Sequence, residues 1–221
     1  MTLIVLNFKT YRESTGSEGL ALARICQEMA REHSLEMVVV PQVADISTIA
    51  AAISIPVFSQ HVDGVGYGGF TGHITAASLK AVGAAGSLIN HSERRLGLAE
   101  IEASIAACRQ AGLKSIVCTN NVATTRAAAA MGPDYVAIEP PELIGSGIPV
   151  SKADPEIVDS SVQAVKRIAP EVGVLCGAGI THGEDLKAAL DLGSQGVLLA
   201  SGIIKAKDQR KALQDLVAGA R

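Results

Sequence analysis

The stretch LIVLN at Leu3–Asn7 is an unbroken run of four aliphatic residues that ends at a polar one. A strand with one face in water alternates apolar and polar residues, whereas a strand buried on both faces is apolar throughout. The run therefore predicts a strand inside a parallel sheet. No GxGxxG turn follows Asn7, which argues against the open, doubly wound sheet of a dinucleotide-binding domain.

Seven further aliphatic runs follow along the chain, each bounded by turn residues and followed by a helical pattern. Parallel neighbours need such a crossover helix, so the order predicts a repeated βα unit. Eight units in 221 residues give about 28 residues each, which favours a single (β/α)8 barrel of the α/β class over an open sheet of fewer, larger units. The later strands are expected at Met37–Val40, Pro56–Gln60, Ser87–Asn90, Ser115–Cys118, Tyr135–Glu139, Val172–Cys176 and Gly196–Ala200.

Helical patterns between the strands carry their own start signals. Apolar residues at positions i, i+3, i+4 and i+7 of Leu22–Met29 predict a helix with one buried face. Asp154-Pro155 predicts a helix with proline in its first turn, and Thr181 with Glu184 predicts a capping box. No Ser/Gly-rich linker or charge run divides the chain, so we expect one domain over residues 1–221.

Composition excludes several classes of function. The chain has 19 Lys and Arg against 22 Asp and Glu, a net charge of −3 and a pI near 6.0, whereas a nucleic-acid or membrane-surface protein carries a basic patch. The apolar fraction of 48% predicts a large core and excludes a disordered chain. We therefore expect no nucleic acid and no membrane among the partners.

The four cysteines are far apart and form no CxxC or Cys/His cluster; they are Cys26, Cys108, Cys118 and Cys176. This spacing predicts reduced, mostly buried thiols rather than a disulfide framework or a zinc site. No basic region precedes the first aliphatic run, and no apolar stretch nears the ~18 residues that a membrane span needs. We expect a soluble, cytoplasmic protein.

Few polar residues stand where the strands of the expected barrel end, which is where such barrels carry their functional groups. Those residues are Asn7 and Lys9 after the first strand, Asn90 and His91 after the fourth, and Glu139 at the end of the sixth. A lone lysine is usually solvated, and a loop histidine is usually just hydrogen-bonded. Their shared position at buried strand ends favours a function.

Glu139 is the sharpest of these candidates. It ends the apolar run Val136–Ile138, where a carboxylate is partly desolvated, and Pro140-Pro141 keeps the chain from entering a helix at once. Desolvation raises the pKa of a carboxylate and makes it a usable general base.

Glycine-rich segments follow the last three expected strands, at Gly145–Gly147, Gly177–Gly179 and Ser201-Gly202. Any one of them could simply serve a tight turn. Three at successive strand ends let backbone N–H groups approach an anion, and the loops after strands seven and eight commonly bind phosphate. The pattern predicts a small substrate that carries a phosphate.

Three of these segments, in this order and spacing, resemble the signature segments of the triosephosphate isomerase family. They are Asn7–Lys9 (NFK), Asn90–Arg95 (NHSERR), and Ile138–Pro141 (IEPP) with Ile144–Gly147 (IGSG). The similarity extends over essentially the whole chain, includes Phe70–Gly72 in the third loop, and is greatest to the shorter, archaeal-type branch.

The chain also departs from the commonest form of that family. It is some tens of residues shorter than the ~250 usual for this barrel. The family's Tyr-Gly-Gly-Ser turn after strand seven reads CGAG at Cys176–Gly179, and Pro141–Leu143 stands where the hinge of the lid usually has Trp. These changes leave the catalytic residues untouched but put in doubt the hydrogen bonds that hold the lid closed.

The resemblance implies a TIM barrel that interconverts dihydroxyacetone phosphate and D-glyceraldehyde 3-phosphate through an enediolate, in glycolysis and gluconeogenesis. It implies that Glu139 moves the carbon-bound proton, that neutral His91 polarises the carbonyl, and that Lys9 with Asn7 stabilises negative charge. Glu93 is expected to be structural, as a partner of Lys9. No metal or organic cofactor is implied. The implied substrate-binding residues are Asn7, Phe8, Lys9, Ile144, Gly145, Gly179, Ala200 and Ser201.

Two larger features are also implied by the resemblance. Residues 140–151 are expected to form a lid that closes over the phosphate. The third loop, with Phe70–Gly72, resembles the family's protruding loop that reaches into a neighbouring subunit, although a glycine-rich surface loop is the simpler interpretation. We expect a homo-oligomer, either a dimer or a tetramer.

Two rival functions stay open from the residues alone. An aldolase would use Lys9 as a Schiff-base nucleophile held in an apolar pocket. A non-catalytic sugar-phosphate binder would keep the glycine segments but has no use for Lys9, His91 and Glu139 at three separate strand ends.

Overall fold

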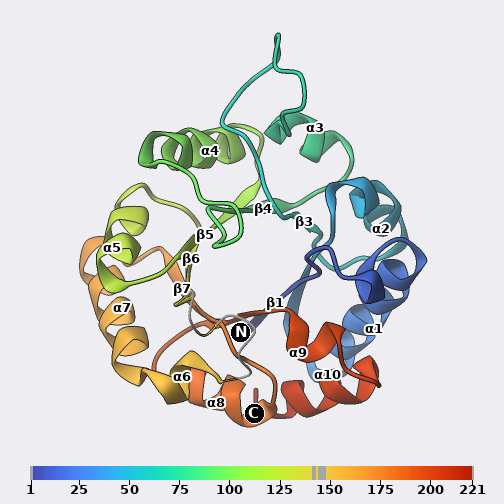
Figure 1. Cartoon of the computed structure of the whole chain (residues 1–221), viewed down its shortest axis with the longest axis vertical. Helices are drawn as coiled ribbons and strands as arrows, with labels where there is room; N and C mark the ends of the chain where they lie inside the picture. Colours follow the sequence, from blue (N-terminus) through green and yellow to red (C-terminus); the bar gives the residue numbers. More distant parts are fainter. Residues whose placement is uncertain (1, 141–142, 144–147, 221) are drawn as a thin grey trace.

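The structure is a computed structural model that describes residues 2–140, 143 and 148–220. Its eight strands are all parallel and surround one centre, with the helices outside them (Figure 1). The strands are β1 Leu3–Asn7, β2 Glu36–Val40, β3 Phe58–Ser59, β4 Gly86–Ile89, β5 Lys114–Thr119, β6 Tyr135–Ile138, β7 Gly173–Gly177 and β8 Gly196–Leu199. The predicted eightfold barrel is confirmed.

The barrel closes between β2 and β3. The ladders run in the order β2-β1-β8-β7-β6-β5-β4-β3, and the remaining gap is spanned by the bridge between Val39 and Val57. There the N–H of Val39 donates to the carbonyl of Pro56 at 3.2 Å. β3 is shorter than the predicted range of 56–60, since proline has no N–H to add to a ladder.

One main helix follows each strand, as expected, and two short helices, α6 and α9, are added after β6 and β8. The helices are α1 Ser17–His33, α2 Ile46–Ala52, α3 Ala76–Ala81, α4 Leu98–Gln110, α5 Val122–Ala130, α6 Val150–Ala153, α7 Pro155–Ile168, α8 Gly183–Asp191, α9 Ser201–Ile204 and α10 Gln209–Ala218. Two 3-10 helices, η1 Arg12–Ser14 and η2 Val43–Asp45, precede α1 and α2.

Two apolar layers explain why the strands carry almost no polar residues. Leu3 and Val5 belong to a cluster inside the barrel, whereas Ile4 and Leu6 pack against the helices in a second cluster. Side chains alternate between the two faces of a strand, so both layers must be apolar. All four cysteines are free and buried, and burial raises the pKa of Cys26 and of Cys176 to about 12.

The helix start signals give one confirmation and one correction. α7 begins at Pro155, and Asp154 caps it by accepting the N–H of Ile157 at 3.1 Å. The prediction of a capping box from Thr181 to Glu184 is wrong by one residue. The capping residue of α8 is His182, and the carboxylate that accepts its N–H belongs to Asp185.

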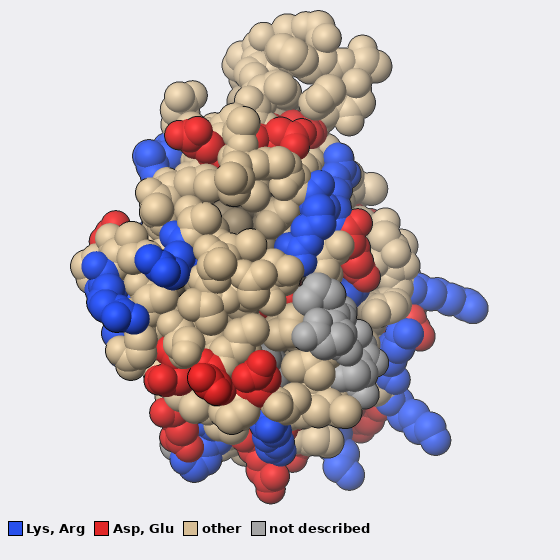
Figure 2. Space-filling view, turned by 60° about the vertical axis from the view of Figure 1, so that its left-hand side comes forward, with Lys and Arg blue, Asp and Glu red and all other residues tan. Residues whose placement is uncertain are grey.

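A segment between β3 and α3 stands out from the barrel, at the top of Figure 1. A bridge between Asp63 and Thr75 closes its base. The intervening residues carry no Lys, Arg, Asp or Glu, and Figure 2 shows the protrusion without charge while both signs are scattered below it. Tyr67 at its tip is 90% exposed. None of the described helices is both long and apolar enough to cross a bilayer.

Candidate active site

The ends of β1, β4 and β6 bring four predicted residues to one pocket. Asn7, Lys9, His91 and Glu139 line it together with residues of the loops after β7 and β8. A cavity of about 580 Å³ adjoins this pocket and shares Asn7, Lys9 and His91 with it. Residues more than 80 positions apart in the chain therefore meet because parallel strands all end at the same side of the barrel.

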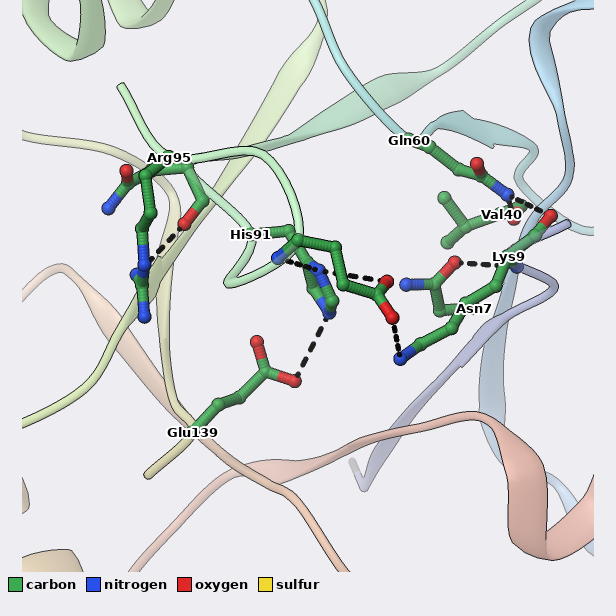
Figure 3. A network of polar contacts seen from close by, with 9 residues as sticks. Asn7, Lys9, Val40, Gln60, His91, Arg95 and Glu139 are labelled. Carbon is green, nitrogen blue, oxygen red and sulfur yellow. Dashed lines mark hydrogen bonds and ion pairs between the residues drawn. The ribbon is translucent and has the colours of Figure 1, made fainter. Parts of the chain in front are cut away.

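His91 and Glu139 face each other across this pocket (Figure 3). The Nε2 atom of His91 lies 3.7 Å from Oε1 of Glu139, and both residues are buried. The second carboxylate oxygen, Oε2, is buried without a hydrogen-bond partner among the described residues. Burying such an oxygen is costly, so the carboxylate has an unused acceptor for a bound molecule.

The tautomer of His91 follows from its own hydrogen bond. The backbone N–H of Glu93 donates to Nδ1 of His91 at 3.2 Å. A ring nitrogen that accepts a hydrogen bond carries no proton, so this bond favours the tautomer with the proton on Nε2. The N–H of His91 thus points toward the pocket and Glu139.

The carboxylate of Glu139 is confined from two sides. The thiol of Cys118 lies beneath it, and burial together with the charge of Glu139 raises the pKa of that thiol well above 9.0. Gly177 of β7 lies on the other side, where an added Cβ would overlap Cγ of Glu139 and come within 3.0 Å of its Cδ. The missing side chain at Gly177 leaves the room that Glu139 occupies.

Lys9 has a left-handed backbone, with φ +48°, which is strained for a residue other than glycine. The side chain of Asn7 accepts its N–H at 3.0 Å, and Nε2 of Gln60 donates to its carbonyl at 2.8 Å. Gln60 also donates to the carbonyl of Val40 at 3.1 Å. The ammonium group of Lys9 lies 3.0 Å from Oε1 of Glu93, so the expected pairing of Lys9 with Glu93 is present.

Asn90 organises the loop that carries His91, a role that the sequence did not indicate. Its φ is +61°, its side chain donates to the carbonyl of Cys118 at 3.0 Å, and it accepts the N–H of Leu96 at 2.8 Å. Arg95 donates to its carbonyl at 3.1 Å. These bonds hold both ends of the loop, and positive φ at an asparagine is the kind of local signal that sequence alone leaves ambiguous.

The loops after β7 and β8 line the same pocket, through Ala178–Thr181, Ala200 and Ser201. Ala178 and Gly179 both have positive φ, +70° and +73°. Phe8, expected to contact the substrate, has its side chain fully buried in the core cluster between strands and helices, and it does not line the pocket. The predicted Ile144 and Gly145, like half of the expected lid, lie outside the described residues.

The family model described as triosephosphate isomerase matches residues 2–218. A triosephosphate isomerase of Methanosarcina barkeri is 62% identical over 217 residues, 98% of each chain. Those of Methanococcoides burtonii and Methanocaldococcus jannaschii are 63% and 54% identical over 215 residues, covering 97% of this chain and 97% and 98% of theirs.

A solved structure gives the same fold at greater distance. The crystal structure of triosephosphate isomerase from Bartonella henselae superposes with a TM-score of 0.78 and covers 98% of this chain and 99% of its own. Its sequence identity is 21%, so this likeness concerns the fold alone.

Proposed function

This chain belongs to the triosephosphate isomerase family, and on that premise we propose that Glu139, His91 and Lys9 carry its catalytic steps. It is an isomerase that interconverts dihydroxyacetone phosphate and D-glyceraldehyde 3-phosphate, in glycolysis and gluconeogenesis. The observation that carries the assignment of roles is the pair of Glu139 and His91, with Nε2 and Oε1 3.7 Å apart in one pocket.

Glu139 acts as the base. It takes the proton from the carbon beside the carbonyl and returns it to the former carbonyl carbon, while the hydroxyl proton passes to the former carbonyl oxygen, so that no net proton is consumed. Its unpartnered Oε2 and its position between Cys118 and Gly177 support this role, since the oxygen is free to accept and the side chain has little freedom to move.

His91 acts as the electrophile. Its Nε2–H donates to the carbonyl oxygen and stabilises the enediolate oxygen that forms when the carbon loses its proton. This family is itself the standard example of a carboxylate base paired with a neutral imidazole. The hydrogen bond from the backbone N–H of Glu93 to Nδ1 of His91 supports this role of the ring, with the proton on Nε2.

Lys9 and Asn7 supply positive potential and orientation. The side chain of Lys9 is only 12% exposed, and the attraction of its ammonium group for developing negative charge is stronger there than in water. We assign the phosphate to the backbone N–H groups around Gly179, Ala200 and Ser201, together with the segment that includes Ile144 and Gly145. Proton transfer beside a carbonyl needs a base and an electrophile, and this scheme uses no metal or organic cofactor.

The ion pair of Lys9 also favours isomerisation over the aldolase alternative. A Schiff-base lysine attacks a carbonyl through a free amine, whereas Nζ of Lys9 is engaged by Oε1 of Glu93 at 3.0 Å. A sugar-phosphate binder would not need Glu139 and His91 in contact.

A coupled assay of purified protein tests this function. We expect turnover in both directions with added triose phosphate, and no covalent adduct when borohydride is added with the substrate. A trapped adduct of the substrate mass on Lys9 would point to the aldolase, and binding without turnover would point to the binder.

We also propose a homo-oligomer, a dimer or a tetramer, and a cytoplasmic location. The protruding segment 64–72 carries the large side chains of Tyr67 and Phe70, which are 90% and 44% exposed. A large uncharged patch of this kind favours burial against another protein. The cavity of about 580 Å³ beside Lys9 could receive that segment from a second copy. The four cysteines, buried and free of disulfides, support the reducing compartment.

A further inference from the structure

We propose that Lys152 is a positioning residue for the phosphate end of the substrate, which it controls through Asp185 and the loop after β7. The inference rests on the proposed phosphate site. Lys152 belongs to α6, the short helix after β6, and Asp185 belongs to α8, the helix after β7. Neither side chain lines the pocket itself.

Lys152 and Asp185 form a close ion pair in which the Asp185 side chain is nearly buried. Nζ of Lys152 lies 2.8 Å from Oδ1 of Asp185, whose side chain is only 4% exposed. The other oxygen, Oδ2, accepts the N–H of Thr181 at 3.0 Å and that of His182 at 2.9 Å. One buried carboxylate therefore joins α6 to two consecutive N–H groups of the loop after β7.

Those N–H groups fix the part of the loop that faces the pocket. Thr181 lines the pocket, and its hydroxyl donates to the carbonyl of Gly179 at 3.3 Å. The loop after β8 packs directly against it, because a Cβ at Gly202 would lie 2.9 Å from both Oγ1 of Thr181 and the carbonyl oxygen of Ile180. A shift of Thr181 would thus move both loops proposed to hold the phosphate.

Lys152 and two backbone N–H groups together hold the carboxylate of Asp185 in place. Burial by itself raises the pKa of Asp185, but the hydrogen bond from Lys152 and the N–H groups of His182 and Thr181 outweigh it and hold the pKa below its usual value. The Lys152 side chain is half exposed, so its removal leaves a nearly buried carboxylate that keeps its two backbone N–H partners but loses a charge-assisted hydrogen bond.

The same helix contains a matched pair that lacks this connection. Nζ of Lys187 lies 2.9 Å from Oδ2 of Asp191, which follows it by one turn of α8, and both side chains are more than half exposed. Within the described part of the chain, its side-chain hydrogen bonds reach Asp191 and not the loop after β7. Lys187→Met therefore removes a lysine and an ion pair from α8 without disturbing Asp185.

The experiment compares Lys152→Met, Lys152→Arg and Lys187→Met with the wild-type chain. Inorganic phosphate is the binding probe, measured by titration calorimetry and by inhibition of turnover. We expect Lys152→Met to weaken phosphate binding and raise KM by about tenfold, with kcat changed by less than about threefold, because a charge-assisted bond is lost away from the reacting atoms. Lys152→Arg restores both values, and Lys187→Met changes neither.

Two results overturn the inference: unchanged phosphate affinity in Lys152→Met, or a loss that Lys152→Arg does not restore. A fall in kcat with KM unchanged also contradicts it, since the role would then concern the reacting carbons. Failure of the proposed function would look different, because the wild-type chain itself would show no turnover while its phosphate affinity could still be compared with that of Lys152→Met.

Discussion

At the scale of single residues, the site is built on backbone conformations that most side chains avoid. Of the four described residues other than glycine with positive φ, three stand at strand ends around the pocket: Lys9, Asn90 and Ala178. Each left-handed residue of this kind costs about 1–2 kcal/mol. Such strain persists only where neighbours hold it, as Asn7 and Gln60 hold Lys9.

The sequence predicted which residue types stand at these strand ends but not what holds them. Lys9, His91 and Glu139 could be located because each follows a recognisable apolar strand. Gln60 could not be assigned, since its contacts with Lys9 and Val40 depend on the closure of the barrel. A hydrogen bond between distant residues has no local sequence signal.

Gly177 offers a prediction at this scale. Gly177→Ala places a Cβ against Cγ of Glu139, so the Glu139 side chain and its carboxylate must shift. A displacement of about 1 Å can cost about 10²-fold in rate, so we expect kcat to fall by about that factor while KM changes little. Steady-state kinetics with both substrates measure this.

Gly97→Ala is the control for that variant, since its φ is −73° and the Cβ it would add meets only the carboxylate end of the exposed Glu100 side chain, at 3.2 Å. We expect wild-type kcat from it. An unchanged kcat in Gly177→Ala would mean that Glu139 does not need the room beside β7.

At the scale of elements, the start of α8 shows where local patterns stop being informative. Glu184 and Asp185 are adjacent acidic residues, and either could fit a capping spacing. The choice depends on where the helix begins, which is fixed by close packing of Gly183 against the carbonyl of Asp215 in α10. That contact joins residues more than 30 positions apart, so the sequence pattern could not contain it.

The base of the protruding segment gives a pH-dependent prediction. Asp63 accepts the N–H of Ile74 at 2.6 Å and contacts Nε2 of His61 at 3.0 Å. Burial raises the pKa of Asp63, but the hydrogen bonds with His61 and Ile74 lower it by more than burial raises it. The folded-state pKa therefore lies below the ordinary 3.8. The stabilisation is therefore fully present above the unfolded-state pKa of about 3.9 and is lost as the pH falls through the folded-state value.

We expect Asp63→Asn to lower the free energy of unfolding by about 1–2 kcal/mol at pH 7, the range for a charge-assisted hydrogen bond near the surface. Urea denaturation of both proteins from pH 7 down to pH 3 measures the difference, which should shrink toward zero at the acidic end. Asp191→Asn, which breaks only the exposed pair with Lys187, should have little effect at any pH. A difference for Asp63→Asn that stays constant with pH would contradict this account.

At the scale of the whole molecule, the sequence predicted the barrel because its strands are buried on both faces. The runs of aliphatic residues reflect two apolar layers, one inside the barrel and one under the helices. The short β3 was not predicted, because closure between β2 and β3 rests on the bridge at Val39 and Val57. The added helices α6 and α9 were not predicted either. The repeated βα pattern identifies the barrel, whereas contacts between distant residues set the length of each strand and helix.

Assembly gives a prediction at the same scale. The wild-type chain of 22.7 kDa should have the mass of a dimer or tetramer by light scattering at micromolar concentration. Phe70→Asp should shift it toward the monomer and lower its activity, because a charge would have to be buried at the contact. Ile168→Asp, at an apolar residue equally exposed (43% against 44%), is the control. A fully active wild-type monomer would contradict the proposed assembly.

The central claim is that the barrel brings Glu139 to the substrate as the base, and kinetics of Glu139→Gln and Glu139→Asp test it most directly. Asp keeps the charge but withdraws the oxygen by about 1 Å, so kcat should fall by about 10²-fold, or about 2.7 kcal/mol. Gln cannot accept a proton and should lose more. In both variants KM should change far less, because the phosphate is held elsewhere. Near-wild-type turnover by Glu139→Gln, in either direction of the reaction, would show that Glu139 is not the base.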